Sequence, residues 1–371
     1  MRQQIYSLDK AVSADGIINV ETAGTLPSYI GFGNAYKRNT LKLSGKLNDS
    51  DMNYLREMTT IGELSDLDFS RATIASGTIS KSLFEGSKLT KVAISESISK
   101  IEERAFYGCA MTEFNIPLQV QEIGSLALKG MQLSTLNVPA ATAMLDLESL
   151  YDMTTLKEID VDADNKQYMS SDGVLFTKYG TSLLLYPSGK EEVSYNTPKR
   201  VMFISEKAFN GTNLRKVALN EGILEIADYA FSNLGWLEAI SLPSTLYKIG
   251  HRAFFGCNKL MDIICFASNP PSLIYDYQEY YGQPYNNFSD KTYNNASLIV
   301  PNGSRSYKTN SGWKLFKFVL EMDLTDVRRI DTNKTMPDGR IYNVSGRESQ
   351  SLRPGLNVIK QSDGTTKKVM K

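Results

Sequence analysis

The chain contains one histidine, His251, which is its first candidate for catalysis or metal binding. A Ser-His-Asp triad needs a histidine as its base, and a histidine-rich zinc site needs more than one. In similar segments of the chain the matching position is filled by other polar residues, namely Glu103, Ser125, Glu206 and Asp228. We therefore interpret the His251 position as one that accepts polar side chains, and we predict no catalytic role for it.

Three aspartates at alternate positions, Asp160, Asp162 and Asp164, have the opening spacing of a calcium-binding loop. Such a loop needs glycine at its sixth position and a bidentate glutamate at its twelfth. Here the sixth position is Asn165 and the twelfth is Ser171. We interpret the segment as the polar turn that leaves a strand, with a weak calcium site as the alternative, and we predict neither a metal nor a cofactor.

Pairs of carboxylates are the remaining catalytic possibility, since glycoside hydrolysis uses two of them ~5 to 9 Å apart. Matching positions on neighbouring strands lie ~4.8 Å apart, so consecutive repeats could supply such a pair. Alignment of the repeats described below places Glu113 beside Lys91 and Thr135, and Asp160 beside Asn137. Because no two acids face each other, we predict that the protein is not an enzyme.

The three cysteines do not suggest a disulfide framework. Cys109 and Cys257 occupy the same place in two repeats that are several repeats apart, which is far beyond the ~6 Å between Cα atoms that a disulfide allows. Cys265 replaces an inward apolar residue. We predict that all three are small buried hydrophobic residues.

Two rows of side chains are better suited to binding. Small residues dominate one row and let a partner approach a sheet closely, while amide and carboxylate groups offer adaptable hydrogen bonds. The row is Ala93, Asn115, Asn137, Asp160, Ala218, Ser241 and Ile264, and beside it lie Lys91, Glu113, Thr135, Glu158 and Lys216. The predicted partner-binding residues are Lys91, Glu113, Asn115, Asn137, Asp160, Lys216 and Ser241. An ordinary solvated face is the alternative.

These rows depend on an internal repeat. The segment from Phe84 to Phe106 contains Leu89-x-x-Val92-x-Ile94, and its apolar positions recur at steps of 22 and then 23 residues. Such a period with Leu-x-x-Leu-x-Leu is typical of a leucine-rich repeat solenoid, in which each repeat buries its apolar face against its neighbours. We predict strand and turn rich repeats with room for about one turn of helix near Arg104-Ala105-Phe106. The apolar positions expected inside are Ile101, Ile123, Ile226 and Ile249.

The expected organisation follows the period. It consists of an N-terminal cap with a first degenerate repeat (1–70), repeats (71–268) with a hairpin insertion (163–200), a C-terminal cap (269–320), a polar linker (321–337) and a small β tail (338–371). Within the first cap, Ser50 is expected to cap a helix from Asp51 to about Met58. A tyrosine-rich tract lies in the second cap and includes Tyr275, Tyr277, Tyr280, Tyr281, Tyr285, Phe288 and Tyr293. We favour a covering role for it over the stacking of sugars or prolines.

Charge and hydropathy restrict the class of protein. The chain has 371 residues, with 41 basic and 41 acidic side chains, so its balance does not favour a nucleic-acid or anionic membrane partner. No stretch approaches the ~20 apolar residues of a membrane span. Charged residues interrupt the first thirty positions, so we expect either a cytosolic protein or a mature form whose export signal has been removed.

The motifs together resemble the BspA-like leucine-rich repeat family over roughly residues 24 to 320. The matching pieces are Ile249-Gly250-x-x-Ala253-Phe254-x-Gly256-Cys257-x-x-Leu260 with partial copies, Ser171-Asp172-Gly173-Val174-Leu175-Phe176, and a Pro-Pro to Gly-Trp-x-x-Phe cap. The resemblance implies an α/β leucine-rich repeat right-handed superhelix with few short helices. It also implies export by Gram-negative gut or oral anaerobes and adhesion to host matrix proteins or other cells.

We therefore expect a secreted or cell-surface, non-enzymatic, adhesin-like monomer whose concave sheet contacts a host protein, matrix or glycan partner. Two alternatives stay open. One is an accessory protein or enzyme of polysaccharide processing, and the other is a structural spacer that presents the C-terminal tail.

Overall fold

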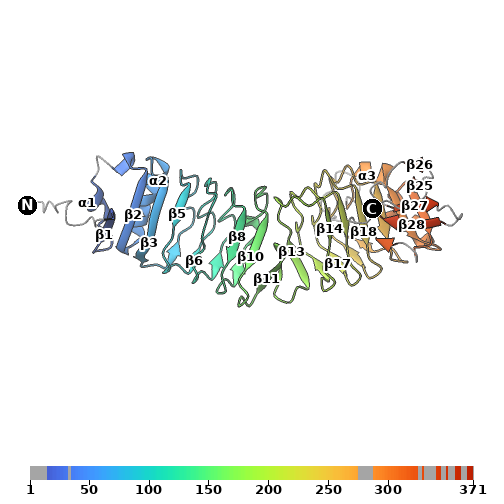
Figure 1. Ribbon diagram of the computed structural model, residues 1–371, viewed down its shortest axis with the longest axis horizontal. Coiled ribbons are helices and arrows are strands. Elements are labelled where there is room, and N and C mark those ends of the chain that lie inside the picture. Colours follow the sequence, from blue (N-terminus) through green and yellow to red (C-terminus); the bar gives the residue numbers. More distant parts are fainter. Residues whose placement is uncertain are drawn as a thin grey trace, which may run out of the picture. The chain divides into compact units, whose positions relative to one another are not determined.

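The structure is a computed structural model of the chain (Figure 1). It describes residues 15–31, 35–274 and 287–324, together with the backbone of five short strands between residues 328 and 370. The chain forms two compact units, Met1–Tyr179 with Leu185–Lys190, and Gly180–Leu184 with Glu191–Lys371.

Two sets of parallel strands build the first unit. One set comprises the sheet β1 (Ile17–Val20), β2 (Thr40–Leu47), β3 (Asp66–Ile74) and β5 (Lys91–Ala93), and the pair β8 (Thr135–Val138) and β10 (Glu158–Val161). The other set is the sheet β4 (Thr78–Ile79), β6 (Lys100–Ile101), β7 (Glu122–Ile123) and β9 (Met144–Leu145). We call the first set the long-strand sheet and the second the short-strand sheet. Consecutive repeats place their strands side by side in each set, except that residues 113–116, between β5 and β8, form no strand.

The second unit follows the same plan. Its long-strand sheet contains, in order, β14 (Ser194–Asn196), β16 (Lys216–Ala218), β18 (Ala239–Leu242), β20 (Asp262–Cys265), β22 (Ser297–Pro301) and β23 (Phe318–Met322). Its short-strand sheet contains β13 (Ser182–Leu185), β15 (Phe203–Ile204), β17 (Glu225–Ile226), β19 (Lys248–Ile249) and β21 (Ser272–Leu273). All recorded pairs among the strands named here are parallel. The sequence analysis did not anticipate β23.

Two antiparallel elements interrupt the parallel plan. Strands β11 (Tyr168–Ser171) and β12 (Val174–Thr177) pair as an antiparallel hairpin, whereas β13 and β14, which also lie in the predicted insertion 163–200, pair in parallel with β15 and β16. Near the C-terminus, a five-stranded sheet has the order β24 (Arg328–Arg329), β28 (Thr366–Met370), β27 (Leu356–Lys360), β25 (Arg340–Asn343) and β26 (Glu348–Ser349).

Helices are few and short among the described residues, as predicted. They are α1 (Leu26–Ile30), α2 (Asp49–Thr60) and α3 (Asp290–Asn295), with 3-10 turns at Ala35–Lys37, Leu147–Ser149, Arg305–Lys308 and Trp313–Leu315. The predicted cap of α2 was wrong by two residues. The Asn48 side chain, rather than that of Ser50, accepts from the backbone amides of Ser50 and Asp51, and the Asp51 side chain accepts from the amide of Asn48.

The predicted helical turn near Arg104 is also wrong. Each repeat forms hydrogen-bonded turns there instead, for example from the amide of Tyr107 to the carbonyl of Arg104. Two positions before the repeat phenylalanine, or before Leu128 that replaces it in one repeat, the backbone is left-handed, at φ 50 to 58°. None of these residues is a glycine: Ser82, Arg104, Leu126, Lys207, Tyr229 and Arg252. A right-handed helix cannot continue through a residue with left-handed backbone, and an L residue in this conformation is strained.

Two ladders of side chains run through the core. Ile101, Ile123, Ile226 and Ile249 are at most 1% exposed, and their strands pair in register, which confirms that they lie inside. Behind them the repeat phenylalanines stack ring on ring, with centroids 5.4 Å apart for Phe84 and Phe106, 4.5 Å for Phe209 and Phe231, 5.0 Å for Phe231 and Phe254, and 5.0 Å for Phe254 and Phe288. Burial of each ring contributes about 2 to 3 kcal/mol. This core holds the outward side chains of the strands in fixed register.

Candidate functional site

In the first unit, four predicted positions form one exposed polar face. Strand β8 pairs with β10 so that Thr135 lies opposite Glu158 and Asn137 opposite Asp160. All four side chains are exposed, whereas the residues between them, such as Ile159, are buried. Side chains directly opposite on parallel strands are ~4.8 Å apart, so Asn137 and Asp160 can contact one partner group together. We call Thr135, Asn137, Glu158 and Asp160 the β8–β10 face.

The remaining predicted residues of the first unit are less regularly placed. Lys91 is exposed at the start of β5, where it pairs in register with Asp66 of β3. Glu113 and Asn115 are exposed too, but residues 113–116 do not form a strand. The expected strand pairing of Glu113 with Lys91 and Thr135 therefore does not occur as ladder pairing, because the long-strand sheet is interrupted at this repeat.

In the second unit, the matching row is largely apolar. Lys216 is half-buried, and Ser241, directly opposite Ala218 and Ile264, is 1% exposed. Among the residues that the structure describes, the Ser241 hydroxyl has no hydrogen-bond partner. Leu324 packs with Ile264 and Ile299 on this side of the sheet. Ser241 therefore does not reach solvent as the predicted contact residue would have to.

The long-strand sheet of the second unit also carries Asp262, the first residue of β20. Burial raises the pKa of its carboxyl to about 7. The alternation of the strand alone does not reveal this shift, because it depends on the surroundings of the carboxyl in the folded chain.

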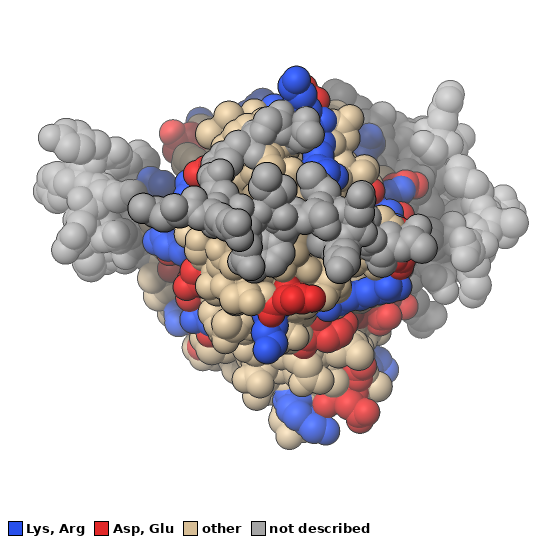
Figure 2. All heavy atoms as spheres, turned by 90° about the vertical axis from the view of Figure 1, so that its left-hand side faces the viewer, with Lys and Arg blue, Asp and Glu red and all other residues tan. Residues whose placement is uncertain are grey.

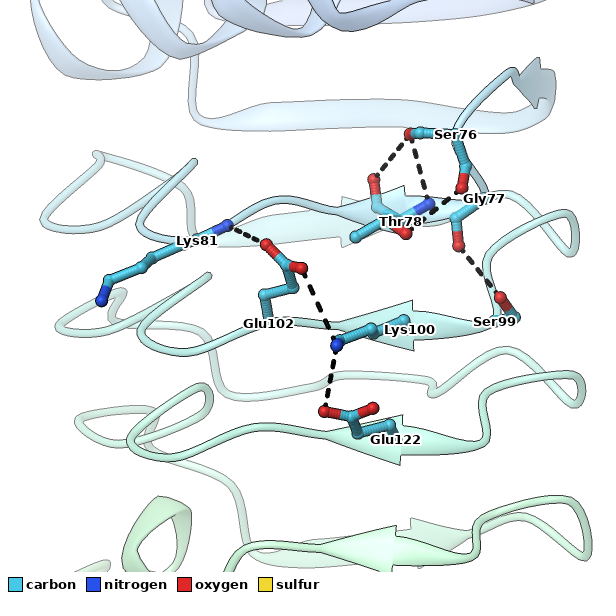
Figure 3. A network of polar contacts seen from close by, with 8 residues as sticks. All are labelled: Ser76, Gly77, Thr78, Lys81, Ser99, Lys100, Glu102 and Glu122. Carbon is cyan, nitrogen blue, oxygen red and sulfur yellow. Dashed lines mark hydrogen bonds and ion pairs between the residues drawn. The ribbon is translucent and has the colours of Figure 1, made fainter.

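The short-strand sheet carries charged side chains that are paired with one another (Figure 3). Lys100 Nζ lies 3.2 Å from the carboxylate of Glu122 and 3.8 Å from that of Glu102. Glu102 also accepts a hydrogen bond of 2.9 Å from the backbone amide of Lys81. The network joins three consecutive repeats through partners within the chain, so its geometry accounts for register between repeats and not for catalysis.

Another ion pair sits at a repeat turn. The guanidinium of Arg104 binds both carboxylate oxygens of Glu85 in a bidentate contact. This hydrogen bonding lowers the pKa of Glu85 to about 2. Arg104 also lies 4.1 Å above the ring of Tyr107. Such a pair fixes the turn that the left-handed Arg104 backbone begins.

Acidic candidates of the first unit lie on β10 and in the turn that follows it. In the pair β8 and β10, each acid faces an uncharged residue. Asp162 accepts from the amide of Asp164, and the buried Asn165 side chain donates to the carbonyls of Pro139 and Thr142, as expected of a polar turn. Across the described ranges, no group of three or more His, Cys, Asp or Glu side chains is arranged to hold a metal ion.

His251 is 9% exposed, and its ring packs edge-on against Tyr229 at 5.5 Å between centroids. Its backbone amide donates to the Asp228 carboxylate at 2.7 Å. The position thus accepts a polar residue within a packed turn, as the comparison of repeats indicated.

All three cysteines are free and buried, as predicted. Cys109 contacts the Ser87 hydroxyl at 3.3 Å, and the Cys257 thiol donates to the carbonyl of Phe231 at 2.9 Å. Cys265 contacts the Tyr307 hydroxyl at 3.1 Å. Burial raises the pKa of the Cys257 thiol to about 12 and that of the Cys265 thiol to about 11. These thiols are protonated at neutral pH and are poor nucleophiles.

The tyrosine-rich tract is only partly described. Residues 275–286, with five of its tyrosines, lie outside the described residues. Tyr293 and Phe288 are buried and pack against Phe316, at 4.8 and 5.1 Å between ring centroids. These two residues are part of the core, and the covering role of the tract stays a prediction.

The second unit carries an exposed aromatic group that was not predicted from the sequence. Trp236 is 47% exposed, and the ammonium of Lys259 lies 3.4 Å from its ring centroid. The signal was present in the sequence, because other repeats have Ala110, Gln132 or Asn213 in the Trp236 position.

Charge and membrane features agree with the composition. On the face seen in Figure 2, basic and acidic atoms are interspersed among uncharged ones without a continuous patch of one sign. Among the described residues, none of the helices combines the length and the apolar composition needed to cross a bilayer.

Parallel strands at a spacing of 22 to 23 residues, an isoleucine ladder and a phenylalanine stack define a leucine-rich repeat protein. A family model described as the BspA type leucine-rich repeat region matches residues 77–175 and 189–275 in six copies. The chain belongs to this BspA-type family, which confirms the resemblance seen in the sequence.

Solved structures with a similar fold come from bacteria. A leucine-rich repeat protein from Eubacterium ventriosum is 18% identical, with 86% of this chain and 84% of that chain covered and a TM-score of 0.55. The pneumococcal vaccine antigen PcpA is 20% identical (78% and 80% covered, TM-score 0.48), and a leucine-rich cell surface protein from Faecalibacterium prausnitzii is 18% identical (82% and 78% covered, TM-score 0.45). No curated protein matches the chain significantly.

Proposed function

We propose that the protein is a non-enzymatic, adhesin-like binding protein of the cell surface or the secreted fraction, with repeats wound as a right-handed superhelix. The β8–β10 face, together with Lys91, Glu113 and Asn115, contacts a protein or glycan partner. Membership of the BspA-type family supports a binding role. Of the predicted contact residues in the second unit, Lys216 remains in the proposed binding surface. Ser241 does not, because its side chain is buried.

The observation that carries the proposal is the exposure of paired hydrogen-bonding groups on a rigid support. Asn137 and Asp160 lie opposite each other and are exposed, and the adjacent Leu136 and Ile159 are fully buried. An amide beside a carboxylate can donate and accept at one point, with little entropy lost on binding because the strands are already ordered. A face of this kind suits recognition better than chemistry.

The test is a binding array of matrix proteins and glycans, probed with the full chain and with an Asn137→Ala/Asp160→Ala variant. We expect at least one ligand whose affinity falls about tenfold or more in the variant, as for a central interface contact. The matched control is Lys100→Gln/Glu122→Gln on the short-strand sheet, which should bind normally. Silence across the array, combined with hydrolysis of any polysaccharide by the chain, would overturn the proposal in favour of polysaccharide processing.

A further inference from the structure

Two cations flank the exposed Trp236 ring in the second unit. Lys259 Nζ lies 3.4 Å from the ring centroid and the guanidinium carbon of Arg215 lies 5.7 Å from it. Glu238 and Met261 are adjacent, since the amide of Glu238 donates to the carbonyl of Arg215 and the amide of Met261 to the carbonyl of Glu238. We call Arg215, Trp236, Glu238, Lys259 and Met261 the Trp236 cluster.

The cluster exposes apolar surface that the fold does not require. Trp236 and Met261 are each 47% exposed. The only other tryptophan, Trp313, is fully buried and donates its indole N–H to the carbonyl of Pro271. Because small or polar residues fill the Trp236 position in other repeats, packing does not explain an indole here. Tryptophan, methionine and arginine are enriched at protein interfaces, where half-exposed rings become buried.

The charges of the cluster favour an acidic partner. Arg215 is 3.7 Å from the Glu238 carboxylate, with half of its side chain exposed. Among the described residues Lys259 has no carboxylate within ion-pair distance, and the indole face holds its ammonium in place. A carboxylate arriving from outside would therefore meet two positioned cations.

We propose that the Trp236 cluster binds an acidic segment of a partner protein. Carboxylates of that segment contact Lys259 and Arg215, and an apolar side chain between them covers Trp236 and Met261. A peptide fits better than a sugar, because Met261 adds a second exposed apolar side chain to the cluster. This site belongs to the second unit alone and does not depend on binding by the β8–β10 face.

The tryptophan itself reports on the site. Because Trp313 is buried, dissolved ions quench the fluorescence of Trp236. The Trp236→Phe variant gives the background fluorescence of Trp313. At low ionic strength iodide should quench the fluorescence of the full chain more strongly than caesium does, because the cations attract the anion. Lys259→Gln should remove much of this difference, whereas Lys199→Gln, a change of an exposed lysine elsewhere in the unit, should leave it unaltered. Equal quenching by the two ions would overturn the proposed cation field.

Binding is then measured with a synthetic peptide in which glutamates alternate with leucine and serine and which lacks tryptophan. We expect saturable changes in Trp236 fluorescence, with affinity at least about tenfold lower in Lys259→Gln and in Arg215→Gln. For Trp236→Ala, the affinity is measured by calorimetry and should fall by a similar factor. The control variant Tyr179→Ala removes another exposed ring, 82% exposed and outside the cluster, and it should bind the peptide normally. The proposal would be refuted if the full chain did not bind the peptide, or if it bound a version with lysines in place of the glutamates equally well. It would also be refuted, in favour of an anionic glycan, if heparin bound more tightly and this binding depended on Trp236.

Discussion

Replacement of Phe231 by alanine tests the ring stack of the second unit. The ring is fully buried, with Phe209 at 4.5 Å on one side and Phe254 at 5.0 Å on the other, and both neighbours are stacked. Loss of a buried phenylalanine side chain costs ~3 to 5 kcal/mol, and loss of two stacked partners places this variant near the upper end, at about 4 to 5 kcal/mol. Phe231→Leu is the matched control, because Leu128 fills the same position in another repeat, and it should cost about 1 to 2 kcal/mol.

The native thiol of Cys257 provides the assay. It is fully buried and donates to the carbonyl of Phe231, so a thiol reagent can reach it only when this region opens. A loss of about 4 kcal/mol raises the open population roughly a thousandfold at 25 °C. Labelling of Cys257, followed by mass spectrometry of its peptide, should accelerate accordingly, while labelling of Cys109 in the first unit stays unchanged. Acceleration below tenfold, or equal rates for the alanine and leucine variants, would refute the reasoning.

Three further outcomes are expected from thermal unfolding followed by circular dichroism. Asn48→Ala should destabilise the chain by about 1 kcal/mol through loss of the α2 cap, while Asn48→Asp should not; equal melting temperatures for both would contradict the assigned cap. Because Arg104 lowers the pKa of Glu85 to about 2, their pairing stabilises the fold above the ordinary pKa of 4.5, and this stabilisation is lost as the pH falls through about 2. The Arg104→Gln variant should therefore show a smaller fall in melting temperature over that pH window. A profile unchanged from that of the original chain would contradict the pairing. Leu126→Val places a β-branched residue at φ 58° and should cost about 1 to 2 kcal/mol, whereas Leu147→Val, at a half-buried position without positive φ, should cost less.

The repeat architecture could be predicted because it depends on the spacing of large apolar residues alone. Ile101 and Ile123 pair in register as the period requires, and both are buried. The turns could not be predicted, because the left-handed positions hold residues such as Leu126 instead of glycine, and their side chains carry no signal of that conformation. The α2 cap was misplaced because Asn48 and Ser50 are both good capping residues, and only the geometry decides between them.

The candidate face was predictable only where the sheet is regular. Alternation along β8 and β10 correctly placed Asn137 and Asp160 outward and exposed. At residues 113–116 the strand is missing, although the apolar spacing is kept, because spacing reports burial and not backbone pairing. Packing of Leu324 on Ile264 joins segments far apart in the sequence, and a periodic pattern contains no information about such contacts.

The left-handed turn has a consequence for how such chains diversify. Its backbone requirement is met by serine, arginine, leucine, lysine and tyrosine alike, while the residue two positions later, a phenylalanine or Leu128, stays inside. A duplicated repeat can therefore exchange its outer residues without disturbing the interior that it inherits. New binding specificities can arise by substitution on an unchanged scaffold, one repeat at a time.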